Sequence, residues 1–191
     1  MHAETGTPAG APEERALRLT RSELNSLRRS IAEALGPEGA QETLFRVGRQ
    51  WGEEAVRRDG SGSARTRMER ALRGMAAAGL GSATLHAFHV DPSGRGCRVT
   101  GRVLDPLELG RKLETGVSPE GSACTLTTGY LTGVARAVTG IDVVCSPIRC
   151  DARCEGGGCG FEIRAAHDRP KAEAAPRPAG TVPRRAPGRG R

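Results

Sequence analysis

The sequence concentrates its cysteines in one short, glycine-rich stretch. Four of its six cysteines lie between residues 145 and 159, which read Cys145-Ser-Pro-Ile-Arg-Cys150-Asp-Ala-Arg-Cys154-Glu-Gly-Gly-Gly-Cys159. Thiols crowded into a turn either bind a metal ion or form disulfides. The two alternatives place the protein in different redox compartments, so other features of the chain bear on the choice.

Signals for export and for membrane insertion are missing. The first residues, Met-His-Ala-Glu-Thr-Gly, have neither the basic nor the apolar region of a signal peptide. No apolar run approaches the ~20 residues that a membrane span needs. We therefore expect a cytoplasmic protein, in which clustered cysteines favour metal binding over disulfides.

Composition divides the chain into one domain and two flanking segments. Residues 1–14 and 166–191 are low in residues that can form a core, and we expect both to be disordered around a domain at 15–165. The net charge is +7, of which 165–191 contribute +5 and 1–14 contribute −3, leaving +5 for the middle. This modest excess does not predict nucleic-acid binding by the domain, although the basic tail would allow weak, salt-sensitive contact.

Apolar residues recur at helical spacing in the first half of the chain. The pattern predicts helices at about 20–36, 38–58 and 64–78. Thr20 and Glu23 form a capping box at the start of the first helix. Gly36-Pro37 ends that helix, and Gly79 is suited to end the third.

The second half predicts two hairpins and further helices. Alternating residues indicate strands at 83–90 and 97–104, then at 141–146 and 160–164 on either side of the cysteine turn. Short and small-residue helices are expected from Asp105-Pro106 to Glu114 and from a Ser122 cap to Thr139. The predicted fold is α+β, an antiparallel sheet of two hairpins packed against a layer of four to five helices.

Three cysteines are the first candidates for a metal site. Cys150 and Cys159 flank the glycine turn, and Cys124 stands near a helix N-terminus, which favours the thiolate that a metal requires. Cys154 and Cys145 compete for a fourth position. The alternative is that some of these are buried thiols without a ligand, which is our interpretation of Cys97.

Three blocks of sequence resemble the 4-vinyl reductase-type domain. They are Cys124-Thr-Leu-Thr-Thr-Gly-Tyr-Leu-Thr-Gly133, Val143-Val-Cys-Ser-Pro-Ile-Arg-Cys150 and Gly158-Cys-Gly-Phe-Glu-Ile163. Leu44-Phe-Arg-Val-Gly-Arg-Gln-Trp-Gly52 and Met75-Ala-Ala-Ala-Gly-Leu-Gly81 also fit its helical half. The resemblance implies a ligand-binding fold like that of phenol- and xylene-responsive sensor domains, transport-particle subunits and haem-nitric-oxide-binding domains, often as a homodimer.

The resemblance also implies a structural zinc site. Cys124 stands five residues before Gly129, as the zinc ligand of the aromatic sensors does, and Cys150 and Cys159 match the knuckle pair. The glutamate expected three residues before Cys150 is replaced by Pro147. Cys154 or Cys145 would then complete an all-thiolate site, which has no open position for catalysis.

The function expected from these features is binding or sensing of a small hydrophobic molecule, reported through an unknown partner protein. Trp51, Phe88 and Tyr130 are candidate pocket walls, with ordinary core packing as the alternative. Catalysis is not expected: there is no Gly-x-Gly-x-x-Gly loop, and regular alternation puts His86 and His89 on opposite faces of a strand. The alternative function is a non-catalytic scaffold whose basic tail contacts an acidic partner or nucleic acid.

Overall fold

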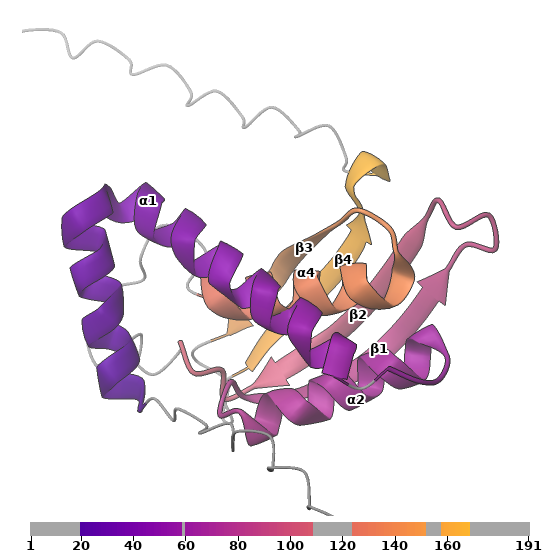
Figure 1. Ribbon diagram of the computed structural model, residues 1–191, viewed down its shortest axis with the longest axis horizontal. Helices are drawn as coiled ribbons and strands as arrows, with labels where there is room; N and C mark the ends of the chain where they lie inside the picture. Colours follow the sequence, from indigo (N-terminus) through magenta and orange to yellow (C-terminus); the bar gives the residue numbers. More distant parts are fainter. Residues whose placement is uncertain (1–19, 59, 109–123, 152–157, 169–191) are drawn as a thin grey trace, which may run out of the picture.

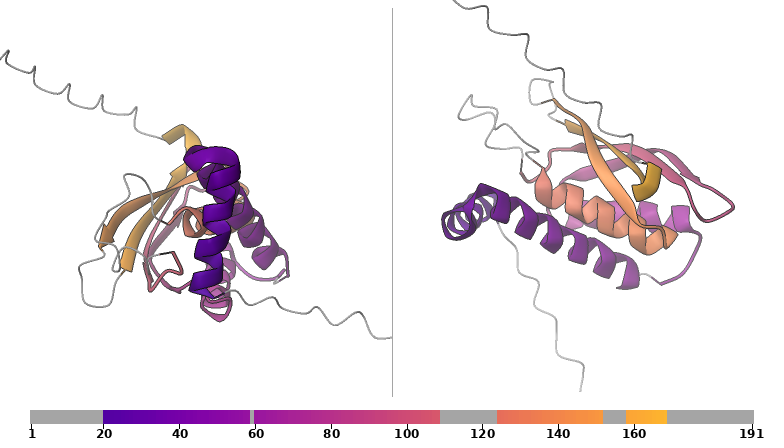
Figure 2. Two further views of the ribbon diagram at one scale, coloured as in Figure 1. Left: turned by 90° about the vertical axis from the view of Figure 1, so that its left-hand side faces the viewer. Right: turned by 90° about the horizontal axis from the view of Figure 1, so that it is seen from above.

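The computed structural model describes residues 20–58, 60–108, 124–151 and 158–168, without the side chains of Arg21 and of 147–151. Within these ranges the chain forms helices α1 (Arg21–Arg58), α2 (Ala64–Ala77) and α4 (Thr125–Thr139) and one four-stranded sheet. Helix α4 lies between α1 and the sheet, and α2 runs along β1 (Figures 1 and 2). The α+β prediction is confirmed. The arm predicted at 1–14 lies outside the described residues. Of the tail predicted at 166–191, only Ala166–Asp168 are described, and they form a short 3-10 helix.

Helix α1 is two helical segments joined at a sharp bend, as the sequence predicts. Gly36 has φ 75° and ψ 168°, outside helical geometry, and Pro37 follows it. Proline disfavours the helical conformation of the residue before it, and glycine tolerates positive φ, so the chain turns here. The capping box is present: the Thr20 N–H donates to Glu23 Oε2 at 2.7 Å, and the Glu23 N–H donates to Thr20 Oγ1 at 3.2 Å.

Helix α2 begins and ends close to its predicted limits. The Ser63 hydroxyl oxygen accepts from the Thr66 N–H at 3.2 Å. Gly79, just beyond the helix, has φ 75°. Within the described residues no helix combines the length and apolarity that crossing a membrane requires.

The sheet is antiparallel throughout, in the order β1-β2-β4-β3. Its strands are β1 (Ser82–Val90), β2 (Cys97–Leu104), β3 (Val143–Asp151) and β4 (Gly158–Ala165). Strands β2 and β4 form its centre, so each predicted hairpin contributes one inner and one outer strand. The second hairpin extends closer to the cysteine turn than predicted, because Cys150 pairs with Cys159 and Asp151 with Gly158.

The buried face of the sheet follows the predicted alternation in β2. Cys97, Val99, Gly101 and Val103 are buried, and Arg98 is exposed. A Cβ on Gly101 would lie 2.4 Å from Cζ of Phe161, its partner on β4. The absent side chain at Gly101 therefore makes room for the aromatic ring.

The prediction that His86 and His89 lie on opposite faces of β1 needs correction. The register shifts between Leu85 and Ala87, which leaves His86 in a bulge. A bulge inserts one unpaired residue and resets the alternation that follows it. Both histidines are consequently exposed, whereas regular alternation would have buried one of them.

Helices α1 and α4 touch through their backbones at four glycines. Each glycine lacks a Cβ that would lie 2.0–2.2 Å from a carbonyl oxygen of the other helix. The four are Gly48 and Gly52 on α1 and Gly129 and Gly133 on α4. Four-residue spacing of small residues is the pattern that lets two helices approach this closely. Helix α4 is buried on most of its surface as a result.

Replacing Gly129 by alanine should therefore push the helices apart. The new Cβ would lie 2.2 Å from the Phe45 carbonyl oxygen, and we expect a loss of roughly 1–3 kcal/mol in the free energy of unfolding. Gly74 in α2 is the matched control, because no atom lies within 4 Å of its added Cβ. Gly74→Ala should stabilise the protein by about 0.5–1 kcal/mol. Urea unfolding checks both, and equal effects would contradict the close contact.

Candidate functional site

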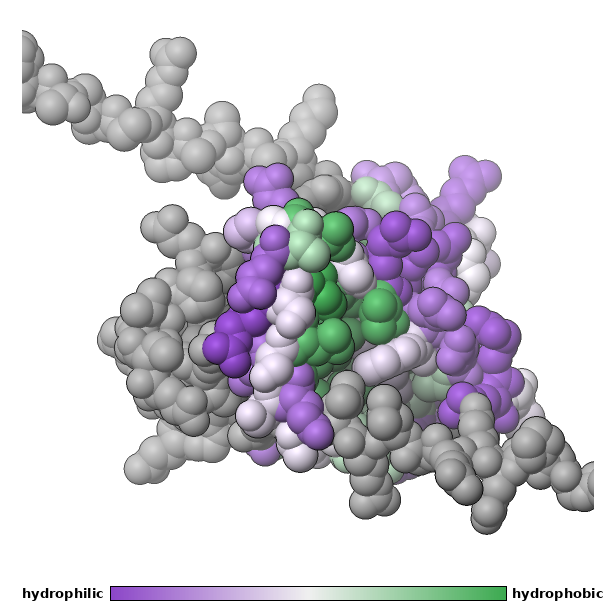
Figure 3. Space-filling model, turned by 60° about the vertical axis from the view of Figure 1, so that its left-hand side comes forward, coloured by the Kyte–Doolittle hydropathy of each residue, from purple (hydrophilic) through white to green (hydrophobic). Residues whose placement is uncertain are grey.

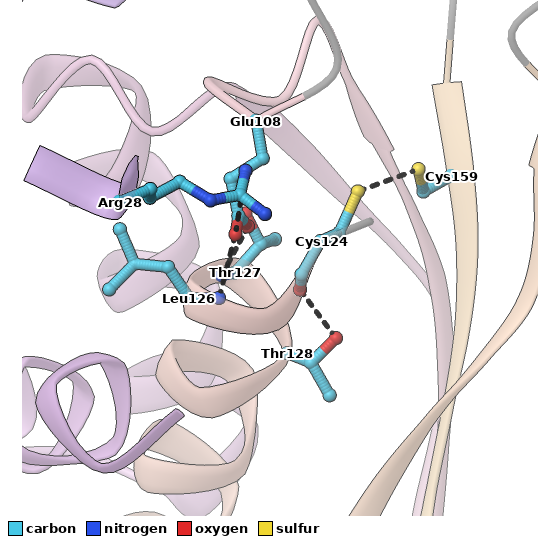
Figure 4. Close-up of polar contacts among 7 residues, drawn as sticks. All are labelled: Arg28, Glu108, Cys124, Leu126, Thr127, Thr128 and Cys159. Carbon is cyan, nitrogen blue, oxygen red and sulfur yellow. Dashed lines mark hydrogen bonds and ion pairs between the residues drawn. The ribbon is translucent and has the colours of Figure 1, made fainter. Parts of the chain in front are cut away.

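Two of the predicted metal ligands lie side by side in the interior. Sγ of Cys124 and Sγ of Cys159 are 3.3 Å apart, and both residues are 4% exposed (Figure 4). Cys124 directly precedes α4, and Cys159 is the second residue of β4. The separation lies between the ~2.0 Å of a disulfide and the roughly 3.8 Å expected of two thiolates on one tetrahedral zinc. Neither residue is in a disulfide.

The sheet register shows which of the other candidate cysteines can lie near Cys159. Cys150 is the direct partner of Cys159 in the β3–β4 pair. Cys145 is instead opposite Ile163. Ile163 is four residues along β4 from Cys159, which is a distance of roughly 13 Å. Its thiol belongs to the hydrophobic core, and burial raises its pKa to about 12. The structure therefore does not bring Cys145 to the other two cysteines, and Cys154 lies outside the described residues.

The described side chains alone do not form a complete metal site. Among them, no group of three or more His, Cys, Asp or Glu is arranged to hold a metal ion. Cys124 and Cys159 are two sulfur ligands of a kind that suits zinc. Cys97 is at the start of β2, whereas Cys159 pairs with Val103 near the other end of that strand. Cys97 is buried within the core, as predicted, and burial raises the pKa of its thiol.

A buried glutamate that the sequence analysis did not identify caps α4. Oε1 of Glu108 accepts from the Leu126 N–H, and Oε2 accepts from the Thr127 N–H, both at 2.9 Å (Figure 4). Nη1 of Arg28, on the first segment of α1, lies 3.9 Å from Oε1. Glu108 is 3% exposed, so its carboxylate connects α4 and α1 in the interior.

This arrangement replaces the predicted Ser122 cap. Ser122 lies outside the described residues, and α4 begins at Thr125 with Cys124 as its N-cap residue. Cys124 makes no side-chain capping bond, and the first turn contains no acidic residue. The first N–H groups of a buried helix need acceptors. The sequence offered Ser122 as a local cap, so nothing in it pointed to a distant acceptor such as Glu108.

The three aromatic residues predicted to line a pocket occupy different environments. Tyr130 is buried and its hydroxyl donates to the Ala71 carbonyl oxygen at 3.0 Å, connecting α4 to α2. Burial raises its pKa to about 12. Phe88 is half-buried against the core, whereas Trp51 on α1 is 41% exposed. The space between helices and sheet holds Met68, Met75, Leu126 and Phe161, all buried.

Exposed apolar side chains occur on α1. Leu27 and Leu35, on its first segment, are 46% and 59% exposed. Figure 3 shows apolar surface near the centre of one face of the molecule, with hydrophilic side chains around it. Apolar surface of this kind is common on proteins and does not by itself define a site.

Comparison with known proteins identifies the fold. The structure is similar to the phenol-responsive sensory domain of the transcription activator PoxR, solved with phenol, at a TM-score of 0.70 and 20% identity; the match covers 82% of this chain and 79% of that one. A trafficking protein particle complex subunit 3 from Naegleria fowleri, covalently bound to palmitic acid, matches at a TM-score of 0.45 and 13% identity, over 76% and 92% of the two chains. The conclusion about the fold rests on the first.

No protein-family model and no curated protein matches the sequence. The resemblance to the 4-vinyl reductase-type domain therefore rests on the motifs alone. The chain shares its fold with the phenol-responsive sensory domain of PoxR.

The Glu108 cap leads to a prediction about stability. Glu108→Ala would leave two buried N–H groups at the start of α4 without their acceptor, and we expect a loss of roughly 2–5 kcal/mol in the free energy of unfolding. Glu69→Ala is the control, because Glu69 is half-exposed and pairs with Arg65 on the surface of α2. Its loss should be within about 0.5 kcal/mol. Similar losses in chemical denaturation would contradict the capping role.

Glu108 should also make stability depend on pH. Burial raises the pKa of its carboxyl above the usual value, although the Thr127 and Leu126 N–H groups and Arg28 oppose the rise. Between the unfolded and folded pKa values, the folded protein binds a proton that the unfolded chain releases, so this contribution falls as pH rises through that window. The stability advantage of wild type over Glu108→Gln should therefore shrink as pH increases above about 4.3, the pKa of an unperturbed glutamate. Parallel pH profiles would contradict this.

Proposed function

We propose that this chain is a non-catalytic module that binds or senses a small, hydrophobic molecule and is stabilised by a zinc ion. The observation that carries the proposal is the buried Cys124–Cys159 pair, with its Sγ–Sγ distance of 3.3 Å. The two thiols come from elements 35 residues apart in sequence. The fold shared with the PoxR phenol-responsive domain supports small-molecule binding.

Zinc would be held by Cys124, Cys159 and Cys150, with Cys154 as the candidate for the fourth ligand. Cys124 fits the role because it stands at the N-terminus of α4, where the helix dipole favours a thiolate. Residue 150 fits because it is paired directly with Cys159. Four thiolates around zinc would stabilise the fold without leaving a position for substrate. The ion would connect the start of α4 to the β3–β4 hairpin.

The ligand would lie between the helices and the sheet. Met68 and Met75 are the largest fully buried side chains in this layer. Methionine is flexible and adapts its packing, so these side chains are suited to rearrange around an apolar molecule. Tyr130 would hold α4 and α2 together beside the ligand, because its hydroxyl donates to the Ala71 carbonyl oxygen. A change in the packing of α2 would be transmitted to a partner protein. The homodimer expected from the resemblance remains a prediction.

Native mass spectrometry of the full chain, purified without added ligand, tests the proposal. We expect one zinc ion per chain in wild type and its loss in Cys159→Ala. Cys97→Ala is the matched control, because it removes a buried thiol from the same sheet outside the proposed ligand set. Zinc retained in Cys159→Ala, or lost equally in both variants, would contradict the ligand assignment. A co-purified organic adduct would support small-molecule binding.

A further inference from the structure

A groove rich in arginine lies at the opposite end of α4 from the two cysteines. The end of α1, the start of α2 and the end of α4 meet there, at the right of Figure 1. The groove has a volume of about 560 Å³. We call it the basic groove; it is lined by Arg49, Glu53, Val56, Arg57, Arg67, Arg136, Ala137 and Gly140. Helix α4 has 15 residues, so roughly 20 Å separates the basic groove from Cys124.

Positive charge dominates the basic groove. Four guanidinium groups face one carboxylate, a net charge of +3. Nε of Arg49 lies 3.9 Å from Oε1 of Glu53, which offsets one charge. The C-terminal ends of α1 and α4 also border the groove, and each helix end contributes about −0.5 of an elementary charge. Together they contribute about −1, and the N-terminal end of α2 contributes about +0.5, so an excess of roughly +2.5 remains for an anion.

Three carbonyl groups near the end of α4, those of Ala135, Arg136 and Ala137, already have donors. Nη2 of Arg67 donates to the Ala137 carbonyl oxygen at 3.1 Å, the Gly140 N–H donates to Arg136 O, and Thr139 Oγ1 donates to Ala135 O. Arg67 is thus the guanidinium group of the groove that already binds this helix end.

Several arginine donors in the groove have no acceptor among the described residues. Nε of Arg67 is buried and has no hydrogen-bond partner there. Arg57 and Arg136 are exposed and form no ion pair with any described residue. A buried polar group without a partner needs an explanation. An oxyanion in the groove would meet these donors.

We propose that the basic groove binds a small phosphorylated molecule with two or more phosphate groups. Guanidinium groups bind phosphate through paired N–H donors, and those of Arg57, Arg67 and Arg136 approach from three different helices. The volume is in the range of small-ligand sites, about 300–1,000 Å³. Ala137, which is half-buried, provides apolar surface for the rest of the ligand. The proposal is independent of the zinc site and of the ligand proposed above.

Calorimetric titration of the full chain with inorganic pyrophosphate tests the basic groove. We expect saturable binding at one site per chain, weaker binding of inorganic phosphate, and loss of affinity as salt is raised. Arg136→Gln and Arg57→Gln should each weaken pyrophosphate binding by about 10- to 100-fold. Both side chains are exposed, so their replacement should leave the fold intact.

Two controls separate the groove from general positive charge. Arg73→Gln makes the same charge change at an exposed position of α2 outside the groove, and it should change the affinity less than twofold. Replacing Arg184 and Arg185 with Gln tests the basic tail and should have as little effect. Equal losses in all variants, or no saturable binding by wild type, would overturn the proposal. So would groove-dependent binding of a polyglutamate peptide without pyrophosphate binding, which would indicate an acidic protein partner.

Discussion

The close backbone contact between α1 and α4 determines how the rest of the structure is arranged. At four glycines the two helices approach until a single methyl group on either would overlap a carbonyl oxygen of the other. Helix α4 is thereby held between α1 and the sheet, and most of its residues are buried. A helix in that position cannot leave its first N–H groups to water. It needs an acceptor from the protein, and Glu108 supplies both of its carboxylate oxygens.

Capping by Glu108 also affects the cysteine site. Because a distant residue satisfies the start of α4, the N-cap residue Cys124 is not needed as a cap, and its sulfur lies against Cys159 on β4. Glu108 does not form a metal-binding group with Cys124 and Cys159 among the described residues, so it does not take the place of the acidic ligand that the resemblance leads us to expect at Pro147. At the start of α4, the Glu108 carboxylate accepts from the backbone N–H groups and the Cys124 thiol contacts Cys159 (Figure 4).

Interactions between residues close in sequence allowed much of the fold to be predicted. The features that were missed depend on contacts between residues far apart in sequence. The capping box at Thr20, the bend at Gly36 and the alternation in β2 depend on residues close in sequence, and all three are present. The role of Glu108 depends on partners 18 and 19 residues away. The separation of Cys145 from Cys159 depends on strand register, and the exposure of His86 on a bulge. The periodicity of a single segment shows neither its contacts with distant residues nor the register in which it pairs with another strand.

We propose that the start of α4 brings Cys124 to the β3–β4 hairpin, where it binds zinc through sulfur. X-ray absorption at the zinc edge of the purified full chain tests it most directly, because it identifies the ligand atoms and their distances. We expect the zinc to have sulfur ligands alone, at about 2.3 Å. A first shell that contains oxygen or nitrogen would contradict the all-thiolate site, and protein that binds no zinc would contradict the claim itself.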